Sequence, residues 1–167
     1  MAVDLGQLKD LQAGKGLKFN YAGRAYHVEP TVEQGLAFQV AAHERDQRMM
    51  EAQETSTDEN ATKAERDKAL LDVRNETSFG IYAIIAPLFG SKFHMPTKNK
   101  GPRFEGGIIP ELLENGIDFG TLDRILTTMY LMMVNTEDVA AEFAKVGKLD
   151  VARKNVRDRE NTKTETQ

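Results

Sequence analysis

Apolar and polar residues alternate with two different periods along the chain, and the period indicates the type of element. Residues 17–21, "LKFNY", and residues 24–28, "RAYHV", alternate with period two on either side of Gly23, which can adopt positive φ in a turn. Elsewhere apolar residues recur three or four positions apart, which is typical of helices. The pattern therefore predicts a mainly α fold with an N-terminal β-hairpin and a bundle-like C-terminal part.

Capping residues indicate where the helices begin. Asp4 can cap a short helix over residues 5–11, which precedes the hairpin. Thr31 with Gln34 and Thr62 with Glu65 have the spacing of capping boxes. In chain order we expect a long helix from Val32 to about Gln53, a polar interruption over 54–60, a charged helix over 63–74, a helix over 79–85 capped by Thr77 or Ser78, a loop over 91–107, a short helix from Ile108, a long helix over 119–133, and a last helix over 136–146 capped by Asn135.

The chain changes character after Gly147. Residues 1–147 carry the periodic apolar pattern, and we expect them to form a single globular domain. Residues 148–167 are charged and contain few large apolar groups, so they bury too little surface to offset chain entropy. We expect a frayed helix to about Arg157 and disorder beyond it.

Composition excludes several classes of protein. The 167 residues carry a net charge of −4 and include no cysteine. The charge offers no general attraction to nucleic acid or anionic lipid, and the missing thiols exclude disulfides, thiolate zinc sites and cysteine nucleophiles. The N-terminus lacks the pattern of a signal peptide and no apolar run reaches the ~20 residues of a membrane span, so we expect a soluble cytoplasmic protein.

The sequence offers little for catalysis. His27, His43 and His94 are isolated and lack a metal-binding spacing, and the glycine-rich stretches lack the phosphate-binding pattern. The carboxylates of residues 44–76 alternate with lysine and arginine, as on a solvated helix face. We expect a protein that is not an enzyme and holds no metal or cofactor.

A basic loop is one candidate binding site. Between residues 92 and 104 there is no acidic side chain, and the basic and aromatic residues are Lys92, Phe93, Lys98, Lys100, Arg103 and Phe104. Such a pattern can bind a nucleic-acid strand by phosphate pairing and base stacking. It is also compatible with a solvated loop or with a site for an acidic protein.

The run "MYLMMV", residues 129–134, is a second candidate. Six successive helical residues turn through about 500°, so their side chains point to all sides. Leu131 and Met132 then point away from the stripe that joins the core. Either the helix is central to the fold or the surplus apolar groups form a patch for another protein, and both hold if the last helix covers the patch until a partner arrives.

The segments "LKDLQ", "GRAYHVEPTVEQGLAFQ" and "LDRILTTMYLMMVNTEDVAAEFAK" resemble the tail assembly chaperones of long-tailed bacteriophages that infect actinobacteria. In that family a hairpin of the form G-[KR]-x-Y-x-[VI]-x-P precedes a helix that opens with an acidic residue and "GL". The matching residues are Gly23, Arg24, Tyr26, Val28, Pro30, Gly35 and Leu36. The chain departs from the pattern at Phe143, where related chains often carry tryptophan, and in its polar insert around residues 54–68.

The resemblance implies a non-enzymatic protein of the host cytoplasm that binds and solubilises the tape measure protein and leaves before the virion is complete. It also implies contact with the tail tube protein and a longer, frameshifted form of the chain itself. The expected contact residues are Leu131, Met132, Val139 and Phe143. Two alternatives remain: a nucleic-acid-binding accessory protein that uses Lys92, Lys98, Lys100 and Arg103, and a structural protein retained in the virion, such as a head-tail connector.

Overall fold

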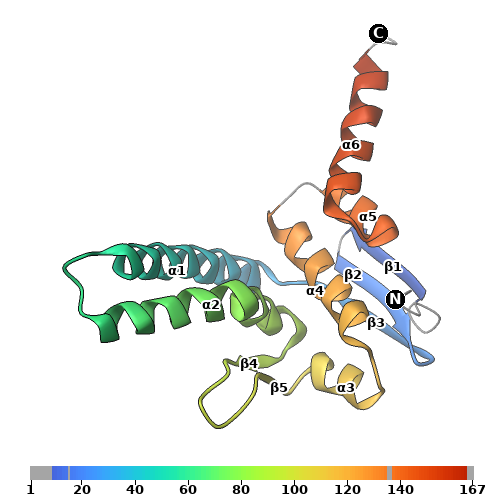
Figure 1. The fold of residues 1–167 in the computed structure, drawn as a ribbon. Helices are drawn as coiled ribbons and strands as arrows, with labels where there is room; N and C mark the ends of the chain where they lie inside the picture. The colour runs from blue at the N-terminus through green and yellow to red at the C-terminus, as the bar shows by residue number, and fades with distance from the viewer. Residues whose placement is uncertain (1–8, 15, 135–136, 165–167) are drawn as a thin grey trace. The chain divides into compact units, whose positions relative to one another are not determined.

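The fold is mainly α with an N-terminal β-hairpin (Figure 1). A computed structural model describes residues 9–14, 16–134 and 137–164. The elements are β1 Lys9–Gly14, β2 Gly16–Tyr21, β3 Arg24–Val28, α1 Val32–Thr57, α2 Lys63–Ile85, the 3₁₀ helix η2 Ala86–Phe89, β4 Lys92–His94, β5 Arg103–Glu105, α3 Ile108–Glu114, α4 Phe119–Val134, α5 Glu137–Val146 and α6 Leu149–Thr164.

The chain divides into two compact units. The first, called here the terminal unit, combines Met1–Glu29 with Glu111–Gln167, and the second, the middle unit, is Pro30–Pro110. The sequence analysis expected one globular domain over residues 1–147 followed by a separate C-terminal segment. In the structure, residues 148–167 belong to the terminal unit, and the middle unit is inserted between the two parts of that unit.

The terminal unit begins with an antiparallel sheet of order β1-β2-β3. The hairpin predicted over residues 17–28 is confirmed as β2 and β3, with Phe19 paired to Tyr26. Its turn residues Ala22 and Gly23 have φ values of 48° and 76°, as a two-residue turn of this handedness requires. The buried side chains of β2 and β3 alternate along each strand, so they lie on one face of the sheet.

The helix expected over residues 5–11 is wrong where the structure describes it. Residues 9–14 form β1, and residues 5–8 lie outside the described part of the chain. In β1, Lys9 pairs with Asn20 and Gln12 with Lys18, with an irregularity between them. Pairing with the neighbouring strand satisfies the backbone of a segment too short to be a stable helix alone, so tertiary context outweighs the local propensity.

Helix α4 lies at the centre of the terminal unit. The stripe predicted along it consists of Phe119, Leu122, Leu126, Met129 and Met133. Its three middle residues are buried, whereas Phe119 at the start of the helix is 70% exposed and Met133 is half-buried. The following helix α5 packs against α4, β1 and α6. The capping role expected for Asn135 lies outside the described residues. Helix α6 continues to Thr164, so the end expected near Arg157 is wrong within the described residues: Ala152 and Val156 are buried and anchor the helix.

In the middle unit, α1 and α2 form a long antiparallel hairpin (Figure 1). Both predicted capping boxes are present, with Thr31 and Thr62 as the N-caps. Two expected boundaries are wrong: α1 runs past Gln53 to Thr57, and α2 passes through Thr77 without a break. The hydroxyl of Thr77 donates to the carbonyl of Val73 at 2.7 Å, so this residue is satisfied inside the helix instead of capping one.

The loop expected over residues 91–107 contains a second hairpin, β4 and β5. Its cross-strand pair Phe93 and Phe104 has ring centroids 4.9 Å apart, and Phe93 also lies 6.2 Å from Phe79 and 6.0 Å from Tyr82 of α2. These aromatic contacts fix the hairpin against α2, which the glycine- and proline-rich sequence did not indicate.

Candidate partner-binding surfaces

The four residues predicted to contact a partner are mostly inside the terminal unit. Leu131 and Phe143 belong to one buried cluster with Ala140 and Ala152, and Met132 is half-buried against that cluster. Val139 is also buried. The structure therefore brings Leu131, Met132 and Phe143 together in the core between α4, α5 and α6, and Val139 is buried without belonging to that cluster. Of the two alternatives for the run, the structure has Leu131 inside the fold, and contact of these residues with a partner stays a prediction.

The apolar run of α4 now has a structural explanation. Met129 is fully buried, while Leu131, two positions and about 200° further round the helix, packs with α5 and α6. Apolar groups are needed on opposite sides because neighbouring elements cover both. Only Val134, at the end of the helix, is a large exposed apolar residue in this run.

Polar contacts hold α6 to α5 in addition to the buried cluster. The carboxylate of Glu142 accepts hydrogen bonds from the Asn155 amide at 2.8 Å and from the Arg159 guanidinium at 2.7 Å. The hydrogen bond from Asn155 contributes most to holding the pKa of Glu142 below its ordinary value, and the nearby positive charge of Arg159 lowers it further. The ionised Glu142 carboxylate therefore stabilises the packing of α6 against α5, next to the cluster that contains Leu131.

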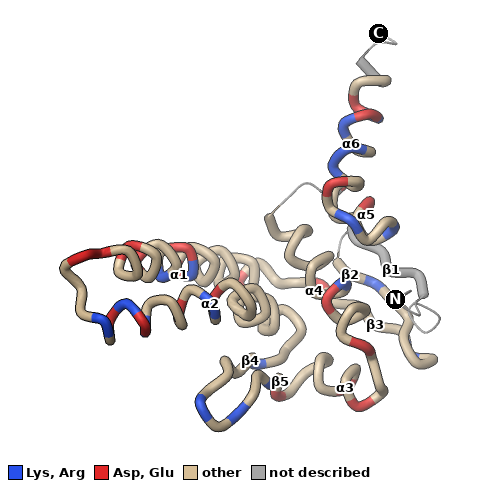
Figure 2. Tube along the Cα trace, viewed as in Figure 1, with Lys and Arg blue, Asp and Glu red and all other residues tan. Residues whose placement is uncertain are grey.

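The four basic residues of the second alternative lie on the β4–β5 hairpin and its tip. Lys92, Lys98, Lys100 and Arg103 are exposed, and none forms an ion pair with another described residue. Figure 2 shows the tip between β4 and β5 with basic positions. However, the rings of Phe93 and Phe104 contact each other and α2, so they are not free to stack on bases. The hairpin offers phosphate-binding charge without a stacking platform.

The hairpin motif on which the family resemblance rests contacts one acidic residue. Arg24 forms an ion pair with Glu111, and the Tyr26 hydroxyl donates to the same carboxylate oxygen at 2.7 Å. Burial, followed by the hydrogen bond to Glu111, raises the pKa of Tyr26. Both motif side chains therefore act inside the terminal unit, where they join β3 to α3, and they give the motif a structural role.

An exposed apolar stripe runs along α1, on the side away from α2. Val32, Leu36 and Val40 recur at intervals of four residues along the helix predicted from Val32. In the structure these three side chains are 83%, 61% and 58% exposed, and Met50 further along is 60% exposed. Phe38, the buried residue of α1, lies on the opposite side. Apolar residues on two opposite sides of one long helix were the sequence signal that could have identified an exposed apolar surface.

Charge is distributed unevenly along the same helix. Helix α1 contains five acidic residues and two arginines. Arg45 and Arg48 both turn toward Glu76 of α2, with ion-pair distances of 3.7 Å and 3.0 Å. The arginines thus lie between the two helices, where Arg45 also contacts Asp46 at 3.5 Å. The five acidic residues of α1 are exposed: Glu33, Glu44, Asp46, Glu51 and Glu54. Figure 2 shows acidic positions along the length of α1.

The contact between α1 and α2 is unusually polar. Arg45 and Glu76 have side chains that are only 16% and 13% exposed, and Gly80 leaves the space that they occupy. A Cβ at Gly80 would lie 2.4 Å from Arg45 Nε and 2.5 Å from Glu76 Oε2. The helices are therefore joined here by a buried ion pair set into a glycine notch.

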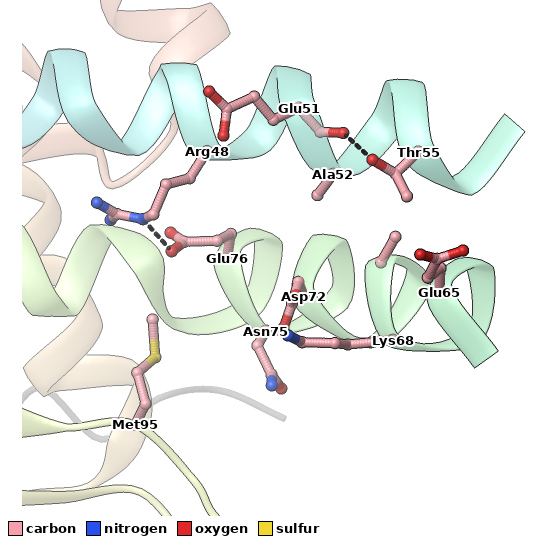
Figure 3. Close-up of a pocket in the computed structure, with 11 residues that line it drawn as sticks. Arg48, Glu51, Ala52, Thr55, Glu65, Lys68, Asp72, Asn75, Glu76 and Met95 are labelled. Atoms are coloured by element: carbon pink, nitrogen blue, oxygen red, sulfur yellow. Dashed lines mark hydrogen bonds and ion pairs between the residues drawn. The ribbon is translucent and has the colours of Figure 1, made fainter. Parts of the chain in front are cut away.

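A cleft of about 570 Å³ continues this contact toward the far end of the hairpin (Figure 3). Arg48 and Glu76 face each other at one end, and Lys68, Asp72 and Asn75 line the side formed by α2. Its lining mixes both signs of charge with alanines and contains no histidine or serine. The cleft has no paired nucleophile and base, so its chemistry is that of a polar, water-accessible groove.

Across residues 9–14, 16–134 and 137–164, no group of three or more histidine, aspartate or glutamate side chains is placed to hold a metal ion. Within the same described part of the chain, no helix combines the length and the hydrophobicity that crossing a membrane requires.

Comparison of the chain with protein-family models, with curated proteins and with solved structures finds no match.

Proposed function

We propose that this chain is a tail assembly chaperone of a long-tailed bacteriophage, which binds the tape measure protein in the host cytoplasm and keeps it soluble until the tail tube forms around it. This function involves no enzymatic reaction. The observation that carries it is the exposed apolar stripe of α1, which includes Leu36, a residue of the motif shared with that family.

An apolar residue that the fold does not bury supports a binding role better than a buried one. Leu36 and Val40 are 61% and 58% exposed although α1 packs against α2. A chaperone needs such groups because its client is itself a long helical protein with apolar side chains to protect. The exposed acidic residues of α1 keep such a surface soluble while no client is bound.

The stripe also changes where a client is expected to bind. The residues first expected to make contact, Leu131 and Phe143 among them, become accessible only if α5 and α6 separate from α4. The exposed apolar side chains of α1 need no rearrangement to be reached, so we assign first contact with a client to α1.

Co-expression tests the function directly. The chain is produced together with the tape measure protein encoded in the same phage genome, and the soluble fraction and the co-purification of the two proteins are measured. We expect the tape measure protein to become soluble and to co-purify with the chain. An insoluble tape measure protein that never co-purifies would rule out the proposed function.

Mass spectrometry of purified virions separates the chaperone from a structural protein. A chaperone leaves before the particle is complete, so its peptides should be absent at the depth where minor tail proteins are detected. Their presence at a fixed copy number would favour a head-tail connector or another retained subunit instead.

A further inference from the structure

We infer that the outer face of α1 binds a cationic amphipathic helix of a partner protein. The binding surface, called here the α1 stripe, consists of Val32, Leu36, Val40, His43, Gln47 and Met50. The inference deepens the proposed function and rests on it in one respect, namely that the partner is a client protein. What it adds is the surface, and the charge and form of the client segment.

The geometry of the stripe fits a second helix. At about 100° per residue, its six positions fall within about 80° of one another around the axis, and they extend over about 27 Å. From Leu36 onward the spacing is four, three, four and three residues, which is the repeat that lets two helices remain in contact along their length. An extended peptide or a small molecule would not need this repeat.

Polar positions in the middle of the stripe indicate a reversible contact. His43 and Gln47 are exposed and separate the aliphatic group at the start of the helix from Met50. Polar side chains in such a seam set the register at the expense of affinity, and methionine adapts to partners of varied shape. A client that must be released suits this composition.

The charges beside the stripe select a cationic partner. Glu33 and Glu51 lie along one side, Asp46 lies on the other, and Glu54 follows the stripe at its end. Arg48 is engaged with Glu76 of α2, and Arg45 contacts both Glu76 and Asp46, so neither arginine balances Glu33, Glu51 or Glu54. Lysine or arginine beside the apolar residues of a partner helix would pair with them and steer its approach.

Other occupants fit the same surface less well. Nucleic acid and anionic membranes carry the same sign of charge as the rim of the stripe. A second α1 would oppose acid to acid. The basic helix α6 of a second copy has its apolar residues Ala152 and Val156 buried, and α2 exposes only the adjacent pair Leu70 and Leu71, which makes a single point of contact instead of a seam.

The test uses the full chain and two labelled peptides. The first is a helix of about 20 residues of leucine and lysine, with leucine at alternating four- and three-residue spacing, and the second has glutamate in place of every lysine. Binding is measured by fluorescence anisotropy at about 0.15 M ionic strength. The probe variant is Leu36→Ser with Val40→Ser. The matched control is Leu70→Ser with Leu71→Ser, because these α2 residues are similarly exposed, at 56% and 54%.

We expect the lysine peptide to bind the unmodified chain and the α2 control equally, and to bind the α1 variant at least about tenfold more weakly. The glutamate peptide should not bind. The thermal midpoints of both variants should match that of the unmodified chain, since the substituted side chains are exposed. Equal loss in both variants, no loss in the α1 variant, equal binding of the two peptides, or no binding of the lysine peptide would each overturn the inference. So would size-exclusion chromatography showing that the α1 variant abolishes self-association of the chain.

The same variants separate this inference from the proposed function. If the tape measure protein is solubilised equally by the unmodified chain and by the α1 variant, the α1 stripe is not its binding surface and the chaperone function stands. If the lysine peptide binds as expected but the tape measure protein remains insoluble, the stripe has another client and the proposed function fails.

Discussion

Replacing Gly80 with alanine tests whether the buried ion pair, and not helix propensity, decides the stability of the α1–α2 hairpin. The new Cβ would lie 2.4 Å from Arg45 Nε and 3.1 Å from Arg45 Cδ, closer than real Cβ contacts allow. Because Cδ and Nε lie within the side chain and not at its tip, the guanidinium must leave its position beside Glu76. Glu76 would then keep only its contact with Arg48.

Two opposing effects set the size of the change. Alanine favours a helix interior over glycine by about 1 kcal/mol. Breaking a buried ion pair by removing one partner costs about 3–5 kcal/mol, and the retained contact with Arg48 reduces this to about 2–4 kcal/mol. The ion-pair effect is larger, so we expect Gly80→Ala to lower the free energy of unfolding by about 1–3 kcal/mol. For a unit of this size each kcal/mol lowers the melting temperature by about 4–8 °C.

Thermal and urea unfolding, followed by circular dichroism, measures the change, and a double-mutant cycle with Arg45→Ala identifies its cause. Alanine removes the Cδ and Nε atoms that the new Cβ would meet, and the end of the Glu76 side chain is then free to move aside, so Gly80→Ala should be neutral or stabilising in the Arg45→Ala background. If Gly80→Ala raised the stability of the otherwise unmodified chain, the glycine notch would have no role. If it destabilised both backgrounds equally, the clash would be with the helix and not with Arg45.

Three further substitutions test other contacts. Gly107→Ala should destabilise the middle unit by at least about 2 kcal/mol in urea unfolding, since the new Cβ would lie 2.5 Å from backbone atoms of residues 89 and 90 and φ at this position is +68°. The control Gly101→Ala, which has open space around it, should change the stability by no more than about 0.5 kcal/mol. Asp118→Ala removes a carboxylate whose pKa is lowered mainly by its hydrogen bond with the Thr121 hydroxyl. The substitution should lower the free energy of unfolding by about 1 kcal/mol at neutral pH. The difference in urea midpoint should shrink as the pH falls below about 4, because the native aspartate is then protonated. Glu142→Gln should speed amide hydrogen exchange in α6 but not in α4. Because the pKa of Glu142 is lowered in the folded chain, acidification should make the unmodified chain exchange like the variant. Unchanged exchange in α6 would show that the apolar contacts of this helix are sufficient to hold it.

The sequence was sufficient to predict those elements whose signal lies within a short segment of the chain. The turn at Gly23 and the capping boxes at Thr31 and Thr62 are local chemistry, and all three are present. The stripe of α4 was also readable because its apolar residues repeat with a helical period. The fold class followed from these signals.

Elements that depend on distant partners were not readable. Residues 9–14 become a strand because β2 is there to pair with, and β4 exists because Phe93 meets Phe104 and α2. The exposure of the candidate site depends on distant partners in the same way: a run of apolar residues in α4 does not reveal whether α5 and α6 cover it. Exposure is a property of the whole fold, so the sequence could indicate a surplus of apolar groups but not the helix that displays them.

The α1 helix differs from an ordinary surface helix because aliphatic residues lie on its outer side as well as Phe38 on its inner side, and this arrangement bears on function. Its inner side places Arg45 against Glu76, while Leu36 and Val40 face outward. Burying a charged pair is often no more favourable than burying aliphatic residues of similar volume, so stability alone gives no reason for this order. Exposed aliphatic residues also carry a risk of aggregation that acidic neighbours only reduce. A requirement outside the folded chain explains the arrangement more simply, because a helix that packs internally through charge can expose its aliphatic residues to another protein.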